Sequence, residues 1–211
     1  MTTEDGGSVE RLAERVLLRV LALGIDGIGP FRSAESIAAR ALAKHGSERK
    51  AIDEVIADHS RLVALNGFVT GLGGLVTMVI ALPINVVGFA LLSARMAAAI
   101  ASIRGLDVAD PATRTEVLLT LTGGNASEVL AKAGVAVPGG RIASSALKRL
   151  PSSTLAFINK GIAFRVLARS LGKGVARFGR LVPLLGGVVG AIIDRALLRS
   201  IAKNARSKLQ S

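Results

Sequence analysis

The stretch that decides the fold is LVALNGFVTGLGGLVTMVIALPINVVGFALLSA, residues 62–94, which contains no charged side chain. One straight helix of these 33 residues would extend about 50 Å, whereas the hydrocarbon core of a bilayer is about 30 Å thick. Two helices broken near the middle would each be slightly shorter than a full span. The stretch therefore permits a transmembrane helix, a buried or re-entrant hairpin, or an unusually apolar helical core.

Small and bulky residues separate onto two faces when this stretch is drawn as a helix. The small and polar face carries Asn66, Thr70, Gly74, Thr77, Ala81, Asn85 and Gly88. Such a face suits close packing against a second helix, and Gly67 and Gly71 form a G-x-x-x-G step within it. Pro83 removes the hydrogen bond to the carbonyl of Val79, which predicts a kink or break there.

A second apolar segment, LVPLLGGVVGAIID (residues 181–194), carries another such step between Gly186 and Gly190. We expect the glycine-rich hairpin, Gly67–Ala94, to pack against Leu181–Ile193. The rest of the chain shows helical spacing between glycine and proline breaks, with Asp110-Pro111 as one clear helix start. No convincing strand alternation is present. The predicted fold class is an all-α, compact helical bundle with a Gly-rich apolar helical hairpin.

The net charge of +12 is concentrated at one end of the chain. Residues 1–140 hold 13 Lys and Arg against 14 Asp and Glu, whereas residues 141–211 hold 14 Lys and Arg against a single acid, Asp194. A field of one sign favours an anionic partner such as phospholipid headgroups, nucleic acid or an acidic protein. Nucleic acid is disfavoured because the chain has no Tyr or Trp for base stacking and no recognised module.

The basic residues of this region recur at every fourth position along two expected helices. These rows are Arg165, Arg169, Lys173 and Arg177, and then Arg195, Arg199 and Lys203. Like charges at that spacing repel one another, and an anionic membrane surface would make them favourable by about 1 kcal/mol each. A solvated helix face explains the rows equally well. Arg95 and Asp194 are isolated charges among apolar neighbours, and we predict that they form a buried ion pair.

Enzymatic function classes find little support. The two histidines, His45 and His59, have no carboxylate or second histidine at ligand spacing, and there is no Cys for a thiolate site or a disulfide. No nucleophile elbow or phosphate-binding loop is present. The chain is therefore predicted to be non-enzymatic, with no catalytic residue, metal or cofactor. Its acidic start, MTTEDGGSVE, is the opposite of a secretory signal and predicts a cytoplasmic origin.

From Ala51 onward the sequence resembles the EcsC protein family. The resemblance is carried by GFVTGLGGLVTMVIALP (Gly67–Pro83), by RMAAAIASIRGLDVADPATRTEVLLTLTGG and by RLVPLLGGVVGAIID. Arg104 stands where the family tends to have an aromatic residue. The resemblance implies an EcsC-like helical domain at residues 51–211 after an N-terminal helical segment at 1–50. It also implies a bacterial, membrane-linked protein, since the family is named for a protein encoded beside an ABC transporter.

Two function classes follow from these observations. The first is a membrane-associated helical protein on the cytoplasmic side of the bacterial cell membrane, peripheral or partly inserted, which supports or regulates a transporter or another membrane process. Its partners would be anionic lipid and a transporter component. The second is a soluble helical module in which the uncharged stretch is buried and binds a protein or hydrophobic ligand. The sequence leaves both open, and it does not define the oligomeric state.

Overall fold

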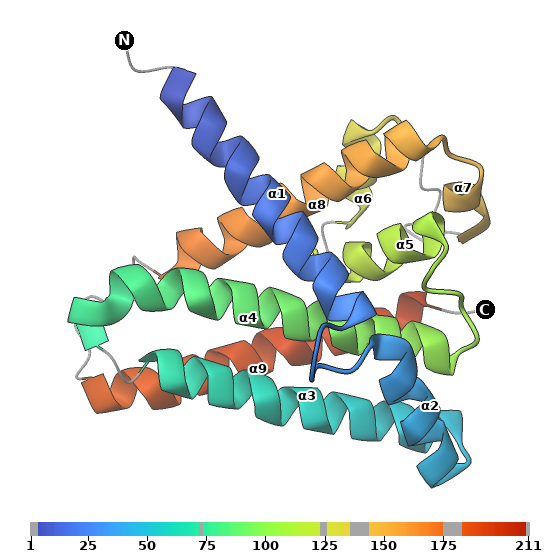
Figure 1. Cartoon of the computed structure of the whole chain (residues 1–211), viewed down its shortest axis with the longest axis horizontal. Coiled ribbons are helices and arrows are strands. Elements are labelled where there is room, and N and C mark those ends of the chain that lie inside the picture. The colour runs from blue at the N-terminus through green and yellow to red at the C-terminus, as the bar shows by residue number, and fades with distance from the viewer. Residues whose placement is uncertain (1–3, 72–73, 123–125, 136–143, 175–182, 210–211) are drawn as a thin grey trace.

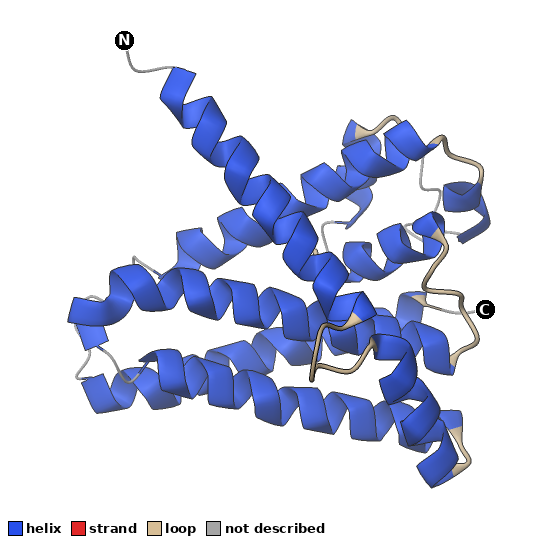
Figure 2. Ribbon diagram, in the orientation of Figure 1, coloured by secondary structure: helices blue, strands red, loops and turns tan. Residues whose placement is uncertain are grey.

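The structure, a computed structural model, describes residues 4–71, 74–122, 126–135, 144–174 and 183–209. Over these residues it is all-helical, with no strand and one isolated bridge between Ile28 and Phe31 (Figure 2). The helices are α1 (Glu4–Asp26), α2 (Ala34–His45), α3 (Glu48–Gly71), α4 (Gly74–Ile103), α5 (Pro111–Leu121), α6 (Ala126–Lys132), α7 (Ser144–Lys148), α8 (Ser152–Gly174) and α9 (Pro183–Lys208). The predicted all-α class is confirmed.

Local sequence explains several helix ends. The Ser33 side chain accepts a hydrogen bond from the backbone N–H of Ser36, and Asp110 caps α5 in the same way at Ala112, with Pro111 in the first turn. Gly46 ends α2 in the left-handed conformation, at φ +60°, and its N–H donates to the carbonyl of Leu42. Asp110-Pro111 is thus the helix start that the sequence predicts.

Helix α4 runs unbroken from Gly74 to Ile103, so the break predicted at Pro83 does not occur. A proline removes only one main-chain hydrogen bond, and the turns on either side keep their own bonds. The predicted glycine-rich hairpin stays a prediction, because its turn at residues 72–73 lies outside the described residues. What the structure shows there is two helices, α3 and α4, packed along each other.

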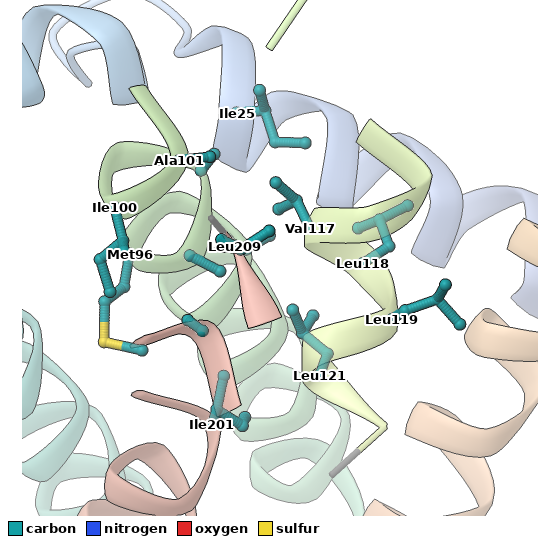
Figure 3. Close-up of a cluster of buried hydrophobic side chains, with 14 of the residues drawn as sticks. Ile25, Met96, Ile100, Ala101, Val117, Leu118, Leu119, Leu121, Ile201 and Leu209 are labelled. Carbon is teal, nitrogen blue, oxygen red and sulfur yellow. The ribbon is translucent and has the colours of Figure 1, made fainter. Parts of the chain in front are cut away.

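Helix α4 is the centre of the fold, in contact with α1, α2, α3, α5, α8 and α9 (Figure 1). Its segment from Ala94 to Ala101 is wholly buried and contains five alanines, whose small side chains allow close approach of neighbouring helices. Below this segment the core is filled by larger side chains from several helices. Figure 3 shows Ile25, Met96, Ile100, Val117, Leu119, Leu121, Ile201 and Leu209 among them.

Helices α3, α4 and α9 run along one another, and each contacts the other two (Figure 1). The last turn of α3 and the first turns of α4 and α9 meet at the left end of that view. These are the three helices that contain the uncharged stretch and the second apolar segment. The fold therefore gathers the chain's two uncharged segments at one end.

Candidate functional site

Helices α3 and α9 touch through glycine. A methyl group added at Gly67 would lie 3.0 Å from the carbonyl carbon of Gly190, and one at Gly187 would lie 3.1 Å from the carbonyl oxygen of Phe68. Both distances are shorter than a normal carbon contact, so only glycine allows the two backbones to approach this closely. Gly67 and Gly190 are two of the predicted packing glycines. Of the other three, Gly71 ends α3, Gly74 begins α4 and Gly186 lies in α9.

The surface on either side of this contact is apolar and exposed. We call it the apolar tip, and define it by the exposed large side chains of the two helices: Leu62, Leu65, Phe68, Val69, Val188, Ile192 and Ile193. Leu65 and Val69 are each 58% exposed, and Ile192 is 63% exposed. Exposed large apolar side chains on two helices in close contact make this surface the candidate interaction site.

The exposed face of α9 changes from apolar to basic partway along the helix. Val188 and Ile192 are exposed, and the same helical face continues into Arg195, Arg199 and Lys203, all exposed. We call these three cations the basic stripe; no ion pair to them is present among the described residues. On α3 the matching change lies between Arg61, which pairs with Asp58, and Leu62. Because the two helices run antiparallel around the Gly67–Gly190 contact, both changes lie at about the same height.

Three polar side chains lie next to one another across α3, α4 and α9, and we call them the polar relay. Asn66 Nδ2 donates to Asn85 Oδ1 at 2.6 Å, and Asn85 lies beside the Asp194 carboxylate. Asp194 Oδ2 has no hydrogen-bond partner among the described residues and faces Gly67, where an added methyl group would lie 2.6 Å from it. The relay ties the three helices together at the base of the apolar tip.

Burial dominates the electrostatics of Asp194, which is 8% exposed. Desolvation raises the pKa of its carboxyl from 3.8 to about 6, and the hydrogen bond with Asn85 opposes that rise only in part. The described residues contain no group of three or more His, Asp or Glu placed to hold a metal ion.

The structure does not bring Arg95 and Asp194 together. Arg95 Nε donates to the carbonyl of Gly24 at 3.3 Å, and its guanidinium lies over the ring of Phe31, 5.5 Å from the centroid. Asp194 instead contacts Asn85, ten residues earlier on α4, which corresponds to about 15 Å along the helix. The predicted ion pair is therefore corrected, because α9 crosses α4 nearer its beginning than the sequence suggested.

The buried charge of Arg95 is stabilised by a main-chain carbonyl and an aromatic ring in place of a carboxylate. It is 5% exposed, and burial lowers the pKa of its guanidinium from the ordinary value. The carbonyl of Gly24 and the face of Phe31 supply partial negative charge in place of a carboxylate. Buried His59 lies nearby and donates from Nδ1 to the Val55 carbonyl at 2.8 Å, and burial lowers the pKa of its imidazole.

The predicted lipid-contacting residues fall into two groups. Arg195, Arg199 and Lys203 are exposed along α9, as the basic stripe. Arg165 on α8 is largely covered and pairs with the exposed Glu128 of α6, so its charge is engaged within the protein. Arg169 and Lys173 belong to α8, but their side chains lie outside the described residues, as does the whole of Arg177.

One helical segment in the described part of the chain, Asn85–Ile103, is long and apolar enough to cross a membrane. Two thirds of it is buried inside the protein, which is also typical of a core helix. Sequence reasoning had placed Asn66 and Asn85 on one face but did not connect them with Asp194. The sequence feature that could have indicated this grouping was the presence of two amides inside one uncharged segment and of a lone acid at the end of the other.

Comparison with known proteins gave one match. A family model described as the EcsC protein family matches residues 30–211, and so begins before the boundary expected at residue 51. Neither the curated proteins nor the solved structures yielded a match.

Proposed function

The chain belongs to the EcsC protein family, and on that premise we propose that it is a non-enzymatic protein that binds the cytoplasmic face of the bacterial cell membrane. The observation that supports this proposal is the apolar tip with the basic stripe directly behind it. The tip offers side chains that gain free energy on leaving water. The stripe offers cations to anionic headgroups at the same boundary.

The expected free energies favour membrane binding by the apolar tip and the basic stripe together. Complete removal of one large aliphatic side chain from water contributes about 1.5–3 kcal/mol, and each cation near an anionic surface contributes about 1 kcal/mol. The combined free energy from several tip residues and the three stripe cations therefore exceeds the cost of confining the protein at a surface. The process served at the membrane is support or regulation of an ABC transporter or of another membrane process, as the family resemblance implies.

The test is co-sedimentation of the purified protein with vesicles of equal parts phosphatidylglycerol and phosphatidylcholine. Leu65→Glu and Ile192→Glu replace exposed tip residues with a helix-forming acid, and each should lower vesicle binding at least tenfold because a charge is disfavoured in hydrocarbon. Phe157→Glu is the matched control: Phe157 is 56% exposed on α8, away from the tip, and the substitution adds the same charge.

The three outcomes have distinct meanings. Loss of binding in the two tip variants with retention in Phe157→Glu supports the proposal. Equal binding by all three variants overturns the role of the tip. A parent protein that stays in the supernatant at low salt overturns membrane association, and leaves the apolar tip as a surface for a protein or hydrophobic ligand.

A further inference from the structure

We infer that the apolar tip enters only one leaflet of the bilayer and stops where Arg61 and Arg195 meet the headgroups, so that the protein is embedded without crossing. This inference rests on the proposed membrane association and specifies its geometry. It is carried by the lengths of the uncharged helix ends, the common height of their charged borders, and the burial of the remaining apolar helix.

The uncharged ends have the length of one leaflet. On α3 the uncharged end runs over residues 62–71, and on α9 over residues 183–193. At 1.5 Å per residue both extend about 15 Å, which is half of a hydrocarbon core of about 30 Å. Neither helix end could reach the opposite headgroups without drawing Arg61, Asp194 or Arg195 into hydrocarbon, and Arg180, three residues before Pro183 in the sequence, limits the depth from the other end of the α9 segment.

The change from charged to apolar side chains lies at about the same height on α3 and α9, which are in close contact. On α3 the exposed face is charged up to Arg61 and apolar from Leu62 onward, and on α9 it is apolar up to Ile193 and basic from Arg195. The Gly67–Gly190 contact fixes the two helices in this register. A flat change from apolar to basic across neighbouring helices matches the step from acyl chains to phosphate.

Among the described helices, α4 is the one that is both long and apolar enough to contradict this geometry. Its uncharged part extends to Ala94, but from Asn85 onward it is largely covered by the other helices. Covering helices that carry charge, such as α1 with Arg15 and Arg19 and α2 with Arg40, would have to enter the bilayer with it. The second half of α4 therefore belongs to the protein core, and only its beginning accompanies the tip.

The polar relay keeps polar groups between the helices at the base of the apolar tip. Asn66 and Asn85 hydrogen-bond to each other between the helices, and Asp194 is buried beside Asn85, so these polar groups are largely turned away from acyl chains. Their position at the base of the tip also holds α3, α4 and α9 together where the protein leaves the membrane. Among the side chains that the structure describes in that region, the exposed large ones are the apolar residues already named.

The chain contains no cysteine, so a single introduced cysteine can be labelled without background. We would attach the environment-sensitive fluorophore NBD at Val69→Cys in the tip, at Arg199→Cys in the basic stripe, and at Phe157→Cys as a control distant from both. Each labelled protein is bound to phosphatidylglycerol–phosphatidylcholine vesicles. Iodide is then supplied either outside the vesicles or only within their lumen.

The expected result is that binding increases NBD emission severalfold at residue 69, shifts it to shorter wavelength, and protects it from iodide on both sides. At residues 199 and 157 outside iodide should continue to quench. Quenching at residue 69 by lumenal iodide would show that the tip crosses the bilayer and would overturn the inference. A label at residue 69 that outside iodide still quenches, on protein that pellets with vesicles, would also overturn it while membrane association stands.

Discussion

The backbone of Gly67 in α3 lies directly against that of Gly190 in α9, with no room for a side chain between them. Gly67→Ala would place a methyl group 2.6 Å from Asp194 Oδ2 and 3.0 Å from the Gly190 carbonyl carbon, so the helices must separate. We expect a loss of about 1–3 kcal/mol in the free energy of unfolding, which outweighs the better helix propensity of alanine. Urea denaturation measures this loss.

Gly161→Ala is the matched control for that substitution. It adds the same methyl group inside α8, where the nearest atom outside its own helix would be Val129 Cγ1 at an ordinary 3.4 Å. This variant should be unchanged or more stable by up to about 1 kcal/mol. If Gly67→Ala were as stable as Gly161→Ala, the close α3–α9 contact would not be the arrangement in solution.

Asp194→Asn should stabilise the protein at neutral pH but not in acid. The carboxyl pKa is raised from 3.8 to about 6, so the folded protein holds this proton more tightly than the unfolded chain does. The parent therefore loses stability as the pH rises from about 4 to about 6, and the loss approaches 3 kcal/mol above that range. Asp194→Asn has no ionisable group at this position, so its stability does not fall over this pH range. Thermal or urea unfolding of both proteins between pH 4 and pH 8 measures the difference, and a gap that is constant with pH would contradict the burial of this carboxyl.

Arg104→Ala should loosen the end of α9. The Arg104 guanidinium, at the end of α4, donates to the main-chain carbonyl of Ala205, which also accepts from the N–H of Leu209, and to the carbonyl of Leu209, which lies just beyond the last turn of α9. We expect a loss of about 1–2 kcal/mol in the free energy of unfolding, together with faster amide exchange in α9. Arg61→Ala removes an exposed arginine on α3 and should leave both quantities nearly unchanged.

The basic stripe should contribute to membrane affinity in proportion to its charge. Replacing Arg195, Arg199 and Lys203 by glutamine removes three exposed cations, worth about 3 kcal/mol in all at an anionic surface, or about 100-fold in binding. The same variant should bind neutral phosphatidylcholine vesicles as the parent does. Its affinity for anionic vesicles should also depend less on salt, and equal salt dependence would exclude the stripe from the contact.

The sequence predicted those parts of the fold that depend on local rules. Helix ends at Gly46 and Asp110-Pro111 follow from glycine conformation and side-chain capping, which act within a few residues. The all-α class follows from helical spacing and the lack of strand alternation. The packing role of Gly67 and Gly190 was also readable, because small residues four apart on an apolar helix suit close contact.

The register between helices was not readable, and the site depends on it. Arg95 and Asp194 looked complementary because each is a lone charge, but the place where α9 crosses α4 decides which residues meet. That crossing brings Asp194 to Asn85 and leaves Arg95 to Gly24 and Phe31. The role of Arg104 was hidden for the same reason, since its partners lie 101 and 105 residues further along the chain.

The pairing of α3 with α9 has a consequence for biosynthesis. More than a hundred residues separate the two helices, so α3 and α4 leave the ribosome well before the helix that covers their glycine-lined side has been made. During that interval the nascent chain displays an apolar surface larger than that of the finished protein, which invites aggregation or capture by chaperones. Stalling translation before residue 183 should therefore yield chains that bind chaperones or membranes more strongly than the completed protein does.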